Sequence, residues 1–233
     1  MARDGYRFLA PPLVLGIIAA VFGLIGTSIA LMALAAAIAY FFRDPERKPP
    51  ADPSVVVSPA DGRVMESVAE SLDGQAGRRI SIFLAVWNVH VNRAPMSGRL
   101  ARVEYRPGKF YAAMRARASV ENEQNVFYLD TGHGRIVFKQ VAGWIARRVV
   151  SWKSPGDSLV LGERIGLIRF GSRMDVWLGD VRRDDSISSC GGVSSATSPR
   201  DRGAHTQRAR FFNAPVKRPR GAAPRLATRR LSS

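Results

Sequence analysis

The chain has 233 residues, of which 46% are hydrophobic and 23% charged, and its formal net charge is +16. These proportions are near those of ordinary globular domains, so they exclude a wholly disordered chain and a channel with many membrane spans. The single cysteine, Cys190, excludes an internal disulfide and a zinc site built on cysteines. The length allows one ordinary domain with attachments.

Residues 8–42 contain no charged side chain and are almost wholly apolar. As one helix they would extend about 50 Å, well beyond the roughly 30 Å of a bilayer's hydrocarbon core. We therefore expect either one tilted span or two short helices that fold back around residues 23–28. Basic residues flank both ends, which favours a hairpin with both ends in the cytoplasm. A cleaved signal peptide would have an apolar region of only about 7–15 residues, so we predict that residues 1–42 remain as a membrane segment.

The last 55 residues, 179–233, carry 12 lysines and arginines against 4 acidic residues, which is half of the net charge. They are rich in arginine, serine, alanine, proline and glycine and have few large apolar residues. Such a segment cannot bury enough apolar surface to offset its ordering entropy. We predict a disordered basic tail, and we expect no specific nucleic-acid partner because its charge follows from its composition.

Residues 43–178 remain as one domain in which most predicted elements are strands. In chain order, strands are expected at 63–68, 79–86, 126–129, 136–141, 165–170 and 174–178. The third and fourth flank the sequence DTGHG, which is typical of a hairpin turn. Helices are expected only at 110–118 and 143–150. The predicted fold class is mainly β (α+β), with a β-rich domain behind an N-terminal membrane helix or hairpin.

Few side chains in this domain could carry chemistry. Its two histidines, His90 and His133, are too few for a metal site, and no glycine-rich phosphate loop opens a helix. Serine chemistry needs only a hydroxyl, a base and an orienting acid, which Ser172, His90 and Asp61 could supply.

Each of these residues also has a structural interpretation. Asp61 precedes a glycine and could stabilise a turn, and Ser172 could be a turn residue after Gly171. His90 could be a half-buried histidine bonded to a backbone carbonyl. His133 lies between two glycines, so we interpret it as a hairpin tip without a chemical role.

Four separated segments together resemble the phosphatidylserine decarboxylases of the short bacterial and archaeal type. They are SPADG at 58–62, WNVHVNRAP at 87–95, NEQN at 122–125 and GERIGLIRFGSR at 162–173. The sequence FFRDP at 41–45, where the chain leaves the membrane segment, is also similar. The resemblance keeps a consistent order from about residue 40 to residue 178.

The resemblance implies a single catalytic domain that makes its own cofactor. The Ser172 hydroxyl would attack the carbonyl of Gly171, and β-elimination from the resulting ester would cut the chain between these two residues. A β chain would end at Gly171, and the associated α chain would begin with a pyruvoyl group made from Ser172. His90 would be the base for Ser172, and Asp61 would orient His90 and stabilise its cation.

The implied reaction is the decarboxylation of phosphatidylserine to phosphatidylethanolamine in phospholipid biosynthesis. The pyruvoyl ketone would condense with the substrate amine and accept the electrons left by carbon dioxide. The implied partners are phosphatidylserine and the membrane lipids. The implied location is the bacterial cell membrane, with the catalytic domain on the cytoplasmic side.

The resemblance stops after Leu178, where the basic tail begins. A shifted reading frame near this codon would explain the break, and strands lost with it would leave an unpaired sheet edge. Two other functions stay open from the residues alone. One is a membrane-tethered serine hydrolase that uses Asp61, His90 and Ser172, and the other is a non-enzymatic, basic, membrane-anchored binding module.

Overall fold

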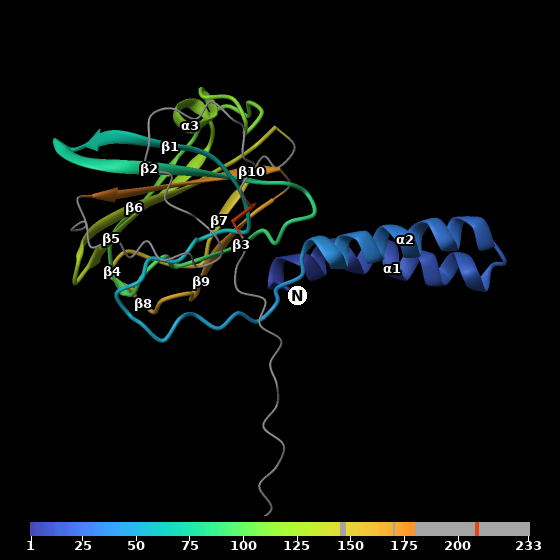
Figure 1. The fold of residues 1–233 in the computed structure, drawn as a ribbon. Coiled ribbons are helices and arrows are strands. Elements are labelled where there is room, and N and C mark those ends of the chain that lie inside the picture. Colours follow the sequence, from blue (N-terminus) through green and yellow to red (C-terminus); the bar gives the residue numbers. More distant parts are fainter. Residues whose placement is uncertain (145–147, 170, 180–207, 210–233) are drawn as a thin grey trace, which may run out of the picture.

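The computed structural model describes residues 1–144, 148–169, 171–179 and 208–209. A helical hairpin projects from a β-rich body (Figure 1). The helices are η1 (Arg3–Gly5), α1 (Tyr6–Val21), α2 (Ile25–Phe41) and α3 (Ala118–Glu121). The strands are β1 (Gly62–Leu72), β2 (Gln75–Leu84), β3 (Val91–Arg93), β4 (Gly98–Arg106), β5 (Gln124–Thr131), β6 (Gly134–Val141), β7 (Val149–Ser151), β8 (Ser158–Leu159), β9 (Arg164–Ile168), β10 (Ser172–Gly179) and β11 (Arg208–Ala209). The mainly β fold class is confirmed.

The apolar N-terminal segment forms two helices, α1 and α2, that lie side by side (Figure 1). The chain reverses at Gly23, whose φ of 74° is a left-handed conformation that glycine adopts without strain. The helices approach closely at Gly16, where a Cβ atom would lie 3.2 Å from the sulfur of Met32. The Ser28 hydroxyl donates a 2.8 Å hydrogen bond to the carbonyl of Gly16. The chain therefore folds back, as one of the two expected arrangements required.

Most of the hairpin's large apolar side chains are exposed, including Val21, Phe22 and Ile29. Burying such a side chain fully is worth about 1.5–3 kcal/mol, so this surface is unfavourable in water. The stretch Arg3–Val21 is long and apolar enough to span a membrane, while Ile25–Phe41 is shorter. The hairpin is thus suited to an apolar environment.

The body contains an eight-stranded sheet in the order β11-β1-β2-β10-β6-β5-β4-β8, and all neighbours are antiparallel. Strands β1 and β2 are joined by Asp73 and Gly74, which both have positive φ. This geometry is that of a two-residue primed turn, whose twist matches the flanking strands. A second sheet has the order β3-β9-β7.

Strand alternation places one row of apolar side chains in the main core. On β6, Ile136 and Phe138 are buried there, and on β10 the buried residues are Met174, Val176 and Leu178. The Phe127 ring of β5 stacks on Phe138 at a centroid distance of 5.0 Å; this strand and β6 are the hairpin expected at 126–141.

One end of this core layer is polar. The Gln140 side chain accepts a 3.1 Å hydrogen bond from Asn125 Nδ2 and donates one of 2.9 Å to Asn92 Oδ1. All three residues are buried. Because Asn92 belongs to β3, this chain of amides joins the two sheets.

The opposite face of β10 carries a buried charge network. Arg173 donates to Asp175 at 2.5 Å and to the Ser81 hydroxyl at 2.7 Å. The other Asp175 oxygen accepts a 2.6 Å bond from the Ser119 hydroxyl of α3, and Lys139 Nζ lies 3.8 Å from it. Each charge in this layer therefore has a partner of opposite sign, as buried charges require.

The prediction of a helix at 110–118 was wrong. The structure has no helix at residues 110–117, and the short helix α3 begins only at Ala118. The Asn122 side chain accepts a hydrogen bond from the Tyr111 N–H at 2.9 Å and donates one to its carbonyl at 2.8 Å. These bonds replace the helical partners of Tyr111. The helix expected at 143–150 was wrong at Val149 and Val150, which lie in β7, and residues 145–147 lie outside the described part.

Two expected strands near the carboxy-terminal end are confirmed as β9 and β10, although Phe170 lies outside the described residues and the strands belong to different sheets. Gly179, assigned to the basic tail from sequence, ends β10. Arg208 and Ala209, also expected to be disordered, pair with β1 as β11. The open backbone edge of β1 explains this pairing. Residues 180–207 and 210–233, where the rest of the predicted tail falls, lie outside the described residues.

Candidate active site

The ends of three adjacent strands bring Asp61 and Ser172 to the same edge of the main sheet. Asp61 immediately precedes β1, Ser172 begins β10, and β2 lies between these strands. Arg63 pairs with Phe83, and Ser172 pairs with Leu84. Since neighbours are antiparallel, the start of β1, the end of β2 and the start of β10 coincide. The loop after β2 leads directly to His90.

The same edge also receives the NEQN segment. Val141, at the end of β6, pairs with both Arg173 of β10 and Gln124 of β5. The beginning of β5 is therefore two strands from Ser172. Segments that are more than a hundred residues apart in the chain thus converge because of the antiparallel strand order.

Ser172 is wholly buried, and its hydroxyl has no hydrogen-bond partner within the described structure. It lies on the same face of β10 as Met174, at the polar end of the core. Gly171 before it has a φ of +62°, which a side chain would disfavour. A serine follows a left-handed glycine here, with its oxygen free to react.

His90 is also wholly buried, and its ring packs on Phe41, the last residue of α2, at a centroid distance of 4.3 Å. Its Nδ1 lies 3.0 Å from the Asn88 carbonyl oxygen. A carbonyl only accepts, so Nδ1 carries the proton, and Nε2, which has no partner in the described structure, is the free base nitrogen. Burial lowers the pKa of His90 to about 4, with a smaller contribution from Arg43. The imidazole is therefore neutral at physiological pH.

Asp61 has a different partner from the expected one. One carboxylate oxygen is ion-paired with Arg47, and the other is buried without a hydrogen bond in the part of the chain described. Burial raises the pKa of Asp61, and the charges of Arg47 and Arg43 oppose the rise. The sequence interpretation had Asp61 orient His90, whereas the structure gives this position at Nδ1 to Asn88.

The open polar atoms of the described residues are concentrated in the four segments singled out from the sequence. Among all the described residues, six buried side-chain atoms lack a hydrogen-bond partner. All six belong to these four segments: Asp61 Oδ1, His90 Nε2, Asn92 Nδ2, Gln124 Oε1, Arg169 Nε and Ser172 Oγ. Natural proteins rarely leave such atoms unpaired without a functional reason. This clustering indicates a reaction site.

The profile of the family described as phosphatidylserine decarboxylase matches residues 34–189 of the chain. The chain belongs to the phosphatidylserine decarboxylase family. It is 47% identical over 178 residues to the phosphatidylserine decarboxylase proenzyme of Ruegeria pomeroyi, covering 73% of this chain and 79% of the relative. It is 51% identical over 152 residues to that of Solibacter usitatus (65% and 72% covered) and 46% identical over 185 residues to that of Desulfotalea psychrophila (76% and 85%).

Membership of this family confirms the enzymatic interpretation: the chain is a decarboxylase, which is a carboxy-lyase. The word proenzyme in the names of these relatives also fits a chain that is processed.

Sequence reasoning missed two residues that contact the candidate site, Asn88 and Arg47. Asn88 lies two positions before His90, and its side chain closes a turn by accepting a 2.9 Å bond from the Ala85 N–H. That Asn-x-His spacing after a strand was the available signal. Arg47 carries no such signal, because its contact with Asp61 depends on where the chain runs after α2.

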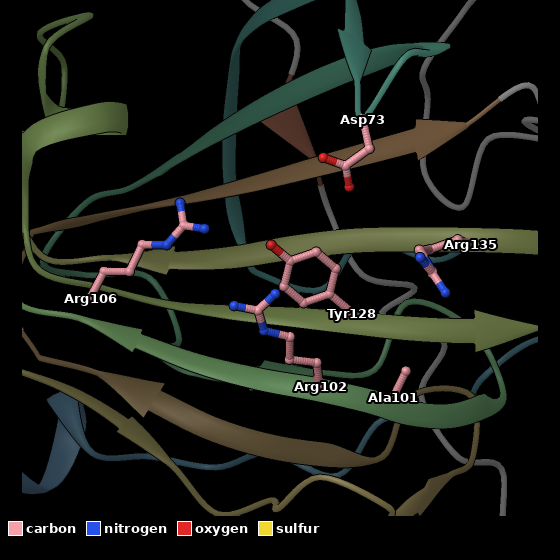
Figure 2. Close-up of a pocket in the computed structure, with 6 residues that line it drawn as sticks. All are labelled: Asp73, Ala101, Arg102, Arg106, Tyr128 and Arg135. Carbon is pink, nitrogen blue, oxygen red and sulfur yellow. The ribbon is translucent and has the colours of Figure 1, made fainter.

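A hollow of about 400 Å³ lies away from this site, over β4, β5 and β6 (Figure 2). Its three arginines are ion-paired with neighbouring carboxylates: Arg102 and Arg106 with Glu104, and Arg135 with Asp130. None of the residues that line the hollow carries one of the six open polar atoms, so the hollow is separate from the candidate site.

Proposed function

We propose that this chain is a self-processing, pyruvoyl-dependent phosphatidylserine decarboxylase that cuts itself between Gly171 and Ser172. The observation that carries the proposal is the pair of buried, unpartnered atoms Ser172 Oγ and His90 Nε2 at the edge where the family's segments meet.

The surroundings of Ser172 fit a group made in place from the chain itself. The side chain is wholly buried, so an external substrate does not reach its hydroxyl as the chain stands, whereas the adjacent peptide bond is always present. This burial favours self-cleavage over the serine hydrolase alternative. The left-handed Gly171 also allows a sharp turn of the backbone at the bond to be cut.

The proposed cleavage starts with transfer of the Ser172 hydroxyl proton to His90. The oxygen then attacks the carbonyl carbon of Gly171, an ester bond forms, the peptide C–N bond breaks, and the nitrogen of Ser172 takes a proton. Removal of the proton on the α-carbon breaks the bond between Cβ and Oγ and releases Gly171 as a carboxylate. Water finally replaces the nitrogen, which leaves as ammonia, and a ketone remains at the new end.

His90 and Asp61 have distinct roles in this proposal. The lowered pKa keeps His90 neutral, so its Nε2 lone pair is available to accept a proton. Asn88 holds the ring by its Nδ1 proton. Asp61 contributes a negative charge at the same sheet edge, which stabilises the cation that His90 becomes.

Once formed, the pyruvoyl group supplies a ketone that binds the substrate amine and accepts the electrons left by carbon dioxide. The protein's own part is to exclude water, place the substrate carboxylate near the group, and return a proton, which we assign to His90.

We also propose that the hairpin inserts into the cell membrane and holds the site at the cytoplasmic surface. Phe41 and Phe42 at its base pack with Val89 and Val91, which flank His90. The apolar surface of α1 and α2 and the proposed base thus share one packed cluster. A lipid substrate would reach the site without leaving the bilayer.

The test is a denaturing gel with intact-mass measurement of the purified full chain. We expect a fragment of about 19 kDa, because 171 of the 233 residues of this 25.5 kDa chain precede the cut. The small fragment should be lighter by one ammonia than a chain that begins with serine. Ser172→Ala should leave only the full-length chain, while Ser71→Ala, at an exposed serine, should be cut normally.

An uncut wild-type chain with an ordinary serine at position 172 would refute self-processing. Labelling of Ser172 by a fluorophosphonate would support the hydrolase instead, because a ketone has no hydroxyl to label. Steeply salt-dependent nucleic-acid binding by an uncut chain would support the non-enzymatic module.

A further inference from the structure

Gly143, just beyond β6, lies against the peptide bond that the proposed reaction cuts. Continuing the β6–β10 register from the Arg173–Val141 pair places Gly143 opposite Gly171. A Cβ atom on Gly143 would lie 1.7 Å from the carbonyl oxygen of Gly171 and 2.9 Å from its carbonyl carbon. The carbonyl oxygen therefore occupies the space that any other residue's side chain would fill.

This backbone contact is held in place by buried groups on both sides of Ala142. The Ala142 N–H donates a 2.8 Å hydrogen bond to the Glu123 carbonyl. Its own carbonyl accepts a 2.7 Å bond from Asn122 Nδ2, and the Asn122 side chain also binds Tyr111. Asn122 and Glu123 belong to the NEQN segment, which has no other role in the mechanism above. Their contacts fix the residue that precedes Gly143.

We propose that Gly143 is a positioning residue for self-cleavage: its bare α-carbon seats the Gly171 carbonyl so that the carbonyl carbon faces the Ser172 hydroxyl. The inference rests on the proposed self-processing and adds the group that orients the bond to be cut. Gly143 acts through the backbone of Gly171 and does not exchange a proton or form a bond.

The size of the effect follows from the contact distance. Real Cβ atoms essentially never approach another heavy atom within 3.0 Å, so an alanine at 143 would displace the Gly171 oxygen or its own backbone by more than 1 Å. A misplacement of about 1 Å between reacting groups costs roughly 100-fold in rate. We therefore expect Gly143→Ala to slow cleavage about 100-fold.

The experiment follows the appearance of the fragment in pulse-labelled full-length protein. Two glycine variants serve as controls. Gly77→Ala places a Cβ atom 2.4 Å from the Leu178 carbonyl oxygen, a comparable clash with the other end of β10. Gly132→Ala, in the β5–β6 turn, meets no atom within 4 Å. We expect Gly132→Ala to be cut at the wild-type rate, and the folded fraction of Gly77→Ala to be cut far faster than Gly143→Ala.

Hydroxylamine adds a readout of the step that is blocked, because it cleaves esters and leaves peptide bonds intact. Gly143 positions the Gly171 carbonyl before the ester forms, so hydroxylamine should release no fragment from Gly143→Ala. Release of a fragment would show that the hydroxyl had already attacked, and would overturn the proposal.

The remaining outcomes also decide. Cleavage of Gly143→Ala at the wild-type rate, or equal slowing in Gly77→Ala, would overturn the positioning role of Gly143 while leaving self-processing intact. If the wild-type chain itself stays uncut, the proposed function fails instead. Should Gly143→Ala not fold, Asn122→Ala removes the clamp on Ala142 without adding atoms and should slow cleavage about tenfold. Wild-type cleavage in that variant would overturn the proposal.

Discussion

The two faces of β10 bury polar groups in opposite ways. On one face, Arg173 and Asp175 bind each other and are further partnered by Ser81 and Ser119. On the other face, one residue away, the Ser172 hydroxyl is equally buried and has no partner in the described structure.

This difference separates stability from chemistry along a single strand. Leaving a buried polar group unpaired costs about 1–3 kcal/mol, a cost that the paired face avoids. The other face retains this free-energy cost at the Ser172 hydroxyl, which the proposed reaction needs. Substitutions on the paired face should therefore change the free energy of unfolding, and substitutions on the open face should change the rate of cleavage.

The largest effect is expected on the open face, for His90→Phe. The new ring can keep the packing against Phe41 but has no nitrogen to accept the Ser172 proton. Loss of a general base costs about 10²–10⁴ in rate, and cleavage should slow by that factor on a time-course gel. His133→Phe, at the exposed hairpin tip, should be cut normally. Normal cleavage of His90→Phe would remove His90 from the mechanism.

On the paired face, Asp175→Ala should lower the free energy of unfolding by about 3–5 kcal/mol, because it leaves the buried Arg173 guanidinium with only a 3.5 Å contact to the Glu66 carboxylate. Urea titration in the uncut Ser172→Ala background measures this. Asp130→Ala, which breaks the exposed pair with Arg135, should cost less than about 1 kcal/mol. Equal losses in the two variants would contradict the distinction between the faces.

The histidine on the open face should also make stability depend on pH. The unfolded chain takes up a proton on His90 below about pH 6.5, whereas the folded chain does so only near pH 4. Stability should thus fall as the pH drops through this window, by up to about 3 kcal/mol, and stay constant above it as far as His90 contributes. The difference between the uncut background and the same background with His90→Phe isolates this term. Parallel pH curves for the two proteins would contradict the buried, neutral histidine.

The smallest effect is expected at Gln140, which is itself hydrogen-bonded but binds Asn92, one of the residues with an unpartnered buried atom. Gln140→Leu keeps the approximate size of the side chain but removes the partner of Asn92 Oδ1 and of Asn125 Nδ2. It should cost about 1–3 kcal/mol in urea titration. Gln75→Leu, at an exposed position of β2, should stay within about 0.5 kcal/mol of its parent. A neutral Gln140→Leu would show that this amide chain is dispensable.

Elements determined by local patterns were predictable from the sequence. The charge-free length of the N-terminal segment and its glycine at position 23 predicted a hairpin as one of two arrangements. The apolar runs around DTGHG predicted β5 and β6 because the turn is encoded between them.

Elements determined by distant contacts were not predictable. Residues 110–118 have helix-forming composition, but Asn122 takes the backbone partners of Tyr111. Strand β4 was missed because arginines at positions 99, 102 and 106 interrupt its apolar alternation, and its pairing with β5 is what makes it a strand.

The candidate site divides in the same way. Its residues Asp61, His90 and Ser172 were recognised from their segments, and the strand order brings those segments together. Their partners Arg47 and Asn88 depend on turns that carry little sequence signal. A glycine such as Gly143 becomes informative only when the atom opposite it is known.

Strand β10 lies inside its sheet, with β2 on one side and β6 on the other. A break just before its first residue would therefore leave β10 in the shorter fragment, where it is hydrogen-bonded on both sides to strands of the longer fragment. Separating the two fragments would break the hydrogen bonds on both sides of this central strand. The two fragments of a cut molecule should therefore purify together and should not exchange with the fragments of other molecules.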